Sequence, residues 1–189
     1  MAESPIYTAE QFLEARLELP DAGRWTELVQ GKIVTLDPPD IEHGTIVLNL
    51  SKVLSLYLHQ VDQGYACFEL GLLVNRGPDT VRFPPAAIFN SGNRFEETDK
   101  VISERKPTVI VEIASTHQRR QLMSDHVNDY VQWGVDLIWV IDPPKQEVLE
   151  YVAGSESQVI DINGKMTGGT VLPGFAMKLK DLFAEPVWW

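Results

Sequence analysis

Two apolar runs constrain the fold of this 189-residue chain most strongly: residues 109–113 read Val-Ile-Val-Glu-Ile and residues 137–141 read Leu-Ile-Trp-Val-Ile. Such runs are typical of strands that are covered on both faces. Between them lies a helical pattern of apolar residues that begins at Ser115 or Thr116, either of which can cap it, and ends at Gly134. A strand, a helix and a strand in this order predict a right-handed parallel crossover.

The N-terminal part of the chain predicts a helix, a hairpin and a second, longer helix. Thr8 can cap a short helix that runs to about Leu17, and residues 25–36 are two β-rich runs around a Gln-Gly turn. From Asp40, an N-cap candidate, apolar residues recur at three- and four-residue steps until Gly64. We therefore expect the longer helix to bury one face.

The remaining segments predict mostly β-structure. Residues 65–76 and 80–89 flank Gly-Pro-Asp and predict an antiparallel hairpin, whereas the charged residues 90–106 predict an exposed connection. The C-terminal part predicts, in order, a strand at 148–152, an edge strand at 158–162, a loop at 164–169, a docking segment at 172–175 and a helical turn at 180–183. Together the patterns predict one α/β domain over residues 1–189, with a mixed sheet flanked by helices.

Composition limits the function. The formal net charge of −11 argues against loose attraction to nucleic acid, although a local basic patch is compatible with it. The lone Cys67 excludes an internal disulfide and a multi-cysteine zinc site, and it fits a reducing compartment. No apolar run approaches the roughly eighteen residues of a membrane span, and the first residues do not have the pattern of a signal peptide. We expect a cytoplasmic protein that does not enter membranes.

A single carboxylate, Glu112, interrupts the first apolar run. A buried and unpaired charge costs several kcal/mol unless a cation or a hydrogen-bond donor meets it. Glu112 is therefore the first candidate for a functional residue.

Several short segments, in order and spacing, resemble the PD-(D/E)XK nuclease superfamily and, within it, the Uma-two family of restriction-endonuclease-like proteins. The segments that carry this resemblance are residues 27–34, 42–44, 68–71, 84–89, 109–113, 134–143 and 172–175. The resemblance covers nearly the whole chain. It implies a restriction-endonuclease-like core, with an N-terminal helix and hairpin, and a homodimer.

The resemblance also implies Mg²⁺-dependent hydrolysis of nucleic acid, with Glu112 and Glu42 as metal ligands and catalytic residues. Members with the full pattern carry an aspartate where this chain has Pro85. The superfamily's lysine would lie at Ala114, and the family's lysine at His126, which makes His126 the third catalytic candidate. The aspartate would anchor the metal and the lysine would orient the attacking water, so both replacements predict impaired cleavage.

Two hypotheses of different classes follow: an impaired Mg²⁺-dependent endonuclease, and a catalytically silent binding or assembly module on the same fold. Glu69 and Asp79 are further candidates to compensate for the missing aspartate, and Asp79 is the poorer of the two because it lies about 20 Å along the strand from residue 85.

Four other features have simpler interpretations. His126 is as compatible with a hydrogen-bonded histidine at the core edge as with a catalytic group. His43 favours helix capping over metal ligation, and the basic segment at residues 117–120 favours solvated surface over a phosphate contact. Trp188 and Trp189 suggest docking on the body or on a partner, and we assign them no ligand.

Overall fold

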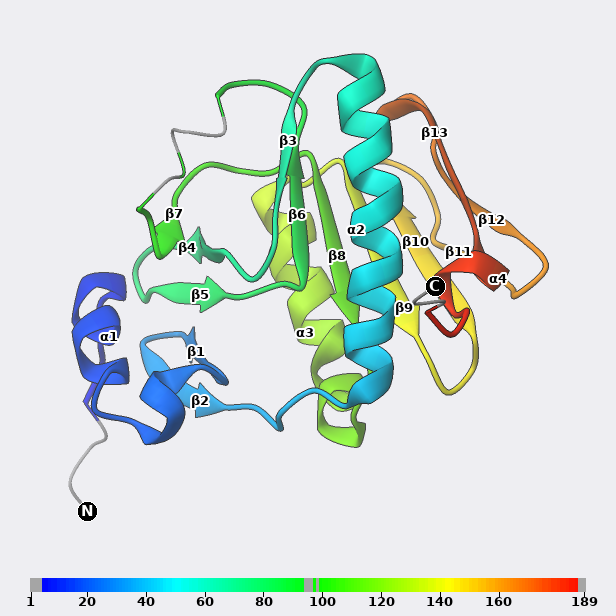
Figure 1. Ribbon diagram of the computed structural model, residues 1–189. Helices are drawn as coiled ribbons and strands as arrows, with labels where there is room; N and C mark the ends of the chain where they lie inside the picture. The colour runs from blue at the N-terminus through cyan, green and yellow to red at the C-terminus, as the bar shows by residue number, and fades with distance from the viewer. Residues whose placement is uncertain (1–4, 94–96, 98, 187–189) are drawn as a thin grey trace.

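The computed structural model describes residues 5–93, 97 and 99–186. Its central element is a six-stranded mixed sheet (Figure 1). In spatial order its strands are β11 (Gln158–Ile160), β10 (Glu147–Val152), β9 (Leu137–Asp142), β8 (Val109–Ile113), β6 (Ala86–Phe89) and β3 (Tyr65–Cys67). β8 and β9 are parallel and every other pair is antiparallel. The predicted crossover is confirmed.

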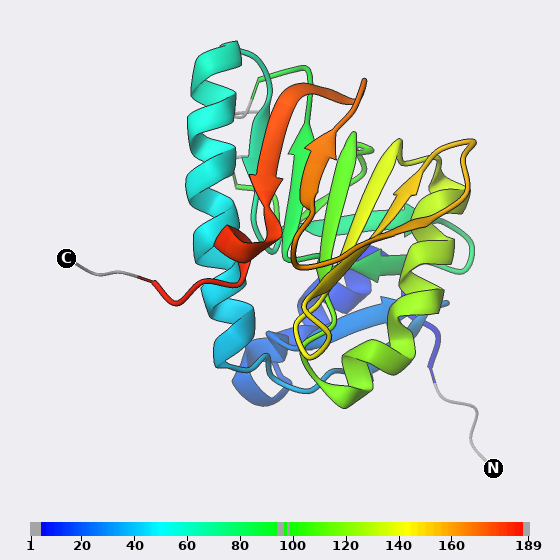
Figure 2. The same cartoon turned by 90° about the vertical axis from the view of Figure 1, so that its right-hand side faces the viewer.

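Two helices cover opposite faces of the central sheet, α2 (Ile41–Val61) and α3 (His117–Trp133) (Figure 2). Alternate residues of each strand therefore face different helices. Val111 and Ile113 pack with the apolar stripe of α2, whereas Ile110 and Ala114 pack with that of α3. Glu112 lies between Val111 and Ile113, so its side chain faces α3.

The N-terminal caps place both helices as the sequence predicts. Asp40 accepts a hydrogen bond from the backbone of His43 at 3.0 Å, and Thr116 accepts one from the backbone of Arg119 at 3.2 Å. Gly134 ends α3 in the left-handed conformation, with φ of 82°. Within the described part of the chain, neither these helices nor any other is long and apolar enough to span a membrane.

A second sheet of five strands lies beside the first (Figure 1). Its order is β2 (Lys32–Thr35), β1 (Thr26–Val29), β5 (Thr80–Arg82), β4 (Gly71–Asn75) and β7 (Ile102–Ser103). The helix α1 (Ala9–Arg16) packs on it through the buried Phe12, and a 3₁₀ turn at Pro20–Gly23 follows α1. The predicted N-terminal helix and hairpin are therefore present.

The predicted antiparallel pairing of residues 65–76 with residues 80–89 is confirmed, but the pairs are divided between the two sheets. β3 pairs with β6 in the central sheet, while β4 pairs with β5 in the second sheet. The two halves separate at Pro84 and Pro85, which have no backbone N–H to continue a ladder, and at Glu69, which has φ of 52°. This break lies where the two sheets meet.

Two other predictions need correction. Residues 90–106 are not wholly an exposed connection, because the chain forms β7 there and buries Ser103 and Glu97; residues 94–96 and 98 lie outside the described residues. The predicted loop at 164–169 is largely the strand β12 (Lys165–Gly168), paired with β13 (Leu172–Lys178). The expected docking segment is the start of β13, with Leu172 and Phe175 in the core, and α4 (Leu179–Leu182) follows.

Candidate functional site

The candidate site lies where the second sheet meets β8 and α3, and Glu112 is near its centre. The Glu112 side chain is buried, with the residue 1% exposed. Its Oε1 accepts a hydrogen bond of 2.6 Å from the Tyr130 hydroxyl and lies 3.0 Å from Nδ1 of His126. The structure therefore brings together two of the three residues predicted to be catalytic, Glu112 and His126.

The helical repeat of α3 explains this arrangement. Residues four apart lie on the same face of a helix, so His126 and Tyr130 both point at the β8 face that carries Glu112. Burial of Met123 and Val127 on this side of the helix fixes its orientation against the sheet. His126 is only 2% exposed, which places it inside the protein rather than at the edge of the core.

A second buried carboxylate, Glu27 of β1, lies on the other side of His126. Its Oε2 is 3.2 Å from His126 Nε2, a distance that fits an ion pair, although the geometry is not that of an aligned hydrogen bond. The same oxygen accepts a hydrogen bond of 2.6 Å from Arg82, and Oε1 accepts one of 3.3 Å from the backbone N–H of Phe83. Glu27 is thus held by two cations.

Arg82 extends this contact to the surface. Its Nε and one terminal nitrogen donate to the half-buried Asp129 at 2.9 and 2.7 Å. The result is a row of alternating charges in which acids and bases follow one another: Asp129, Arg82, Glu27, His126 and Glu112. We call these five residues the buried ion row.

The charges in the buried ion row set the protonation of its members. Burial alone lowers the pKa of His126, but the adjacent Glu112 and Glu27 carboxylates outweigh it and raise this pKa to about 9. Burial alone raises the pKa of Glu27, yet His126 and Arg82 lower it to about 2. Burial and the neighbouring Glu112 raise the pKa of Tyr130. At neutral pH, His126 is therefore an imidazolium between two carboxylates, and Tyr130 donates as a neutral phenol.

None of the other predicted carboxylates joins the buried ion row, although Glu69 lines the neighbouring cavity together with Glu27. Glu42 is exposed near the start of α2 and lines a different cavity, beside Ile41 and Pro143. Glu69 is exposed. Asp79 is buried and holds α1, since its Oδ2 accepts a hydrogen bond of 2.8 Å from the backbone of Ala9. The structure thus does not place Glu42 beside Glu112, and its role as a metal ligand stays a prediction.

The residues around Glu112 do not fit a magnesium ion. Mg²⁺ requires several oxygen ligands in octahedral geometry, and Oε1 of Glu112 is already engaged by Tyr130 and by the imidazolium of His126. Position 85, where the family's aspartate would supply oxygens, holds a proline ring. Over residues 5–93, 97 and 99–186, no three His, Cys, Asp or Glu side chains are grouped so that they could hold a metal.

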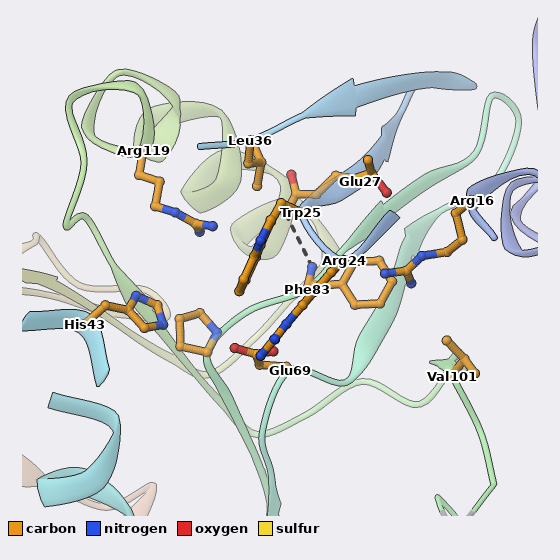
Figure 3. A pocket seen from close by; sticks show the side chains of 12 residues that line it. Arg16, Arg24, Trp25, Glu27, Leu36, His43, Glu69, Phe83, Val101 and Arg119 are labelled. Atoms are coloured by element: carbon orange, nitrogen blue, oxygen red, sulfur yellow. Dashed lines mark hydrogen bonds between the residues drawn. The ribbon is translucent and has the colours of Figure 1, made fainter. Parts of the chain in front are cut away.

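A cavity of about 170 Å³ opens next to the buried ion row (Figure 3). Its walls come from the second sheet, the start of α2, the start of α3 and the break between the sheets. The lining residues are Arg16, Arg24, Trp25, Thr26, Glu27, Leu36, His43, Glu69, Phe83, Pro85, Val101 and Arg119. The cavity therefore combines Glu27 of the buried ion row with several positively charged side chains.

Two of these side chains differ from the sequence-based interpretations. Arg119 is not solvated surface but 6% exposed, and it points into the cavity together with His43 (Figure 3). His43 does not cap α2 with its side chain. The ring is buried, and neither nitrogen has a hydrogen-bond partner among the described residues. Burial, with a smaller effect of Arg119, lowers the pKa of His43 to about 4, so the ring is neutral at pH 7.

Sequence reasoning missed Glu27, Arg82 and Tyr130 as members of the site. A weak signal was present, because Glu27 and Arg82 are opposite charges within β-rich runs, where charges need partners. Their pairing spans 55 positions and could not be inferred from local pattern. The ring of Tyr130 lies in the core, and its hydroxyl also belongs to the site.

Comparisons with known proteins agree with the fold. The chain superposes on the crystal structure of a protein from Anabaena variabilis, described as a putative nuclease belonging to DUF820, with a TM-score of 0.75 and 22% sequence identity; the match covers 94% of this chain and 97% of that one. The comparison with curated proteins found no significant match. The profile of the Uma2 family, described as "Putative restriction endonuclease", matches residues 9–180. This match spans most of the sequence, and the chain therefore belongs to the Uma2 family.

Proposed function

We propose that this chain is a binding module built on the nuclease fold, and that it does not cleave phosphodiesters by a Mg²⁺-dependent mechanism. One observation carries the proposal: the imidazolium of His126 lies between Glu27 and Glu112, where it engages the carboxylate expected to hold the metal. A cation built into the protein thus pairs with Glu112 where a metal ion would be expected.

The alternative hypothesis, an impaired endonuclease, requires chemistry that this site does not favour. Metal-assisted hydrolysis needs a cation with open coordination positions for water and substrate phosphate. An imidazolium has two N–H donors and no open position, and both of its nitrogens face carboxylates. Freeing Glu112 for a metal would leave His126 buried beside a second cation, which is unfavourable.

The experiment combines metal titration with a cleavage assay. We expect no saturable binding of Mn²⁺ or Mg²⁺ up to low-millimolar concentration by calorimetry, and no nicking of supercoiled DNA, in the wild-type protein and in Glu112→Gln. Glu18→Gln, an exposed carboxylate with the same charge change, is the matched control.

The endonuclease hypothesis predicts a different pattern. It requires saturable metal binding and DNA cleavage in the wild type, with both lost in Glu112→Gln and kept in Glu18→Gln. Glu42→Gln tests the second predicted ligand: if it also removes metal binding, Glu42 and Glu112 share an ion and our proposal is wrong.

A further inference from the structure

Cations from separate parts of the chain converge on the cavity beside the buried ion row. Arg16 ends α1, Arg24 precedes β1, and Arg119 lies in the first turn of α3. The chain as a whole carries a net charge of −11, so a concave site with three guanidinium groups contrasts with the overall charge. Such a site favours an anionic ligand.

The acidic residues of the cavity do not cancel these cations. Glu27 is already compensated by Arg82 and His126, with which it shares short contacts. Glu69 is exposed, where solvent screens its charge. Arg24 is exposed as well, so solvent screens both of these charges, and the buried Arg16 and Arg119 leave an excess of positive charge toward the cavity.

Unused hydrogen-bonding groups also point to a ligand. The side chains of His43 and Arg119 are both more than nine-tenths buried. Three of their nitrogen atoms have no hydrogen-bond partner among the residues described: Nδ1 and Nε2 of His43, and Nε of Arg119. Buried polar groups are normally paired, because leaving them unpaired costs free energy. Both side chains face the cavity, which is where a partner can reach them (Figure 3).

Two of the three arginines are held in place before any ligand arrives. One terminal nitrogen of Arg119 donates to the backbone oxygen of Asp37 at 3.2 Å. Arg16 donates to the backbone oxygen of Gly23 at 2.9 Å, and its guanidinium stacks on Phe83 with 4.4 Å between Cζ and the ring centroid. Preorganised donors lose little conformational entropy when a ligand binds.

We propose that this cavity binds a phosphate group, with Arg119, His43 and Arg24 as its principal contacts. This inference rests on the proposed binding function and names its ligand chemistry. Guanidinium groups match tetrahedral oxyanions through paired N–H donors, and a neutral imidazole adds one more donor. The volume of about 170 Å³ is below the range usual for drug-sized ligands, so it suits a single phosphate group and not a duplex.

The cavity lining is compatible with two sources of the phosphate group, the end of a nucleic-acid strand and a small phosphorylated molecule. Trp25 is half-buried in the lining, and Arg24 stacks on its ring at 4.7 Å. A terminal phosphate of a nucleic-acid strand would place its first base near this aromatic side chain, where stacking is favourable. A small phosphorylated molecule would use the cationic groups alone.

The test is calorimetric titration of the full chain with inorganic phosphate in a buffer free of other oxyanions. We expect saturable 1:1 binding, weakened at least tenfold by Arg119→Gln and by Arg24→Gln. Arg24 is exposed and its replacement does not disturb buried packing, which keeps the test informative if Arg119→Gln fails to fold. Lys52→Gln, an exposed residue of α2 outside the cavity lining, removes the same charge and should change the affinity less than twofold.

Two further titrations identify the source. A 5′-phosphorylated oligonucleotide that binds at least tenfold tighter than its 5′-hydroxyl counterpart supports a nucleic-acid terminus, while binding of phosphate and small phosphate esters alone supports a small molecule. The inference is overturned if phosphate does not bind saturably, or if the arginine variants bind phosphate with the affinity of the wild type. This failure differs from that of the proposed function, which is judged by metal binding and DNA cleavage.

Discussion

Replacing His126 by leucine removes the cation that lies between two buried carboxylates. Because the pKa of this histidine rises from 6.5 to about 9 on folding, its protonation contributes about 2–3 kcal/mol to stability at pH 7. Removing one partner of a buried pair typically costs about 3–5 kcal/mol. Tyr130 still donates to Glu112, and Arg82 still pairs with Glu27, so we expect a value near the lower end, about 3 kcal/mol.

Urea unfolding at pH 7, followed by far-UV circular dichroism, measures this loss. Glu112→Gln and the double variant His126→Leu/Glu112→Gln complete a cycle, in which the double variant should lose at least about 1 kcal/mol less than the sum of the single variants. His59→Leu, at an exposed position of α2, is the matched control. A loss below about 1 kcal/mol for His126→Leu, or additive single effects, would refute the inferred pairing.

The pH dependence of stability and the contact between Asp79 and α1 give two more predictions. The raised pKa of His126 contributes stability that is complete below pH 6.5 and lost as the pH rises to about 9, whereas the lowered pKa of Glu27 contributes stability that is complete above pH 4.5 and lost as the pH falls to about 2. Urea midpoints across this range should show both declines, and His126→Leu should remove the alkaline one. Asp79→Ala should cost about 1–3 kcal/mol, because the buried backbone N–H of Ala9 loses its acceptor. Limited proteolysis should then cut within α1 before the rest of the chain; equal resistance in the variant would contradict this role.

The central sheet could be predicted because its signals are local. Residues 109–113 and 137–141 are continuous apolar runs with a capped helix between them, and periodicity alone gives their types and their order. The separation of residues 65–89 into two sheets could not be predicted, because both halves have the same β-rich composition. The ladder breaks at Pro84 and Pro85, and which strand each half joins depends on tertiary packing.

The candidate site was only partly predictable for the same reason. Glu112 is evident from its place in an apolar strand, and His126 from the resemblance to the family. Arg119 lies in a basic segment that resembles ordinary surface, and only the fold shows that the segment turns inward at this residue. His43 is adjacent to Glu42, but on a helix neighbouring side chains point in different directions, so one faces the cavity and the other solvent.

The pairing of His126 with both carboxylates has a consequence for how such sequences diverge. Once the imidazolium is in place, Glu112 and Glu27 contribute to stability as its partners, so substitution of either is selected against even where no metal is bound. A nuclease motif can then keep its glutamate long after cleavage is lost. Under the proposed function, this glutamate alone does not mark an active nuclease, and the residue that faces it on α3 has to be considered with it.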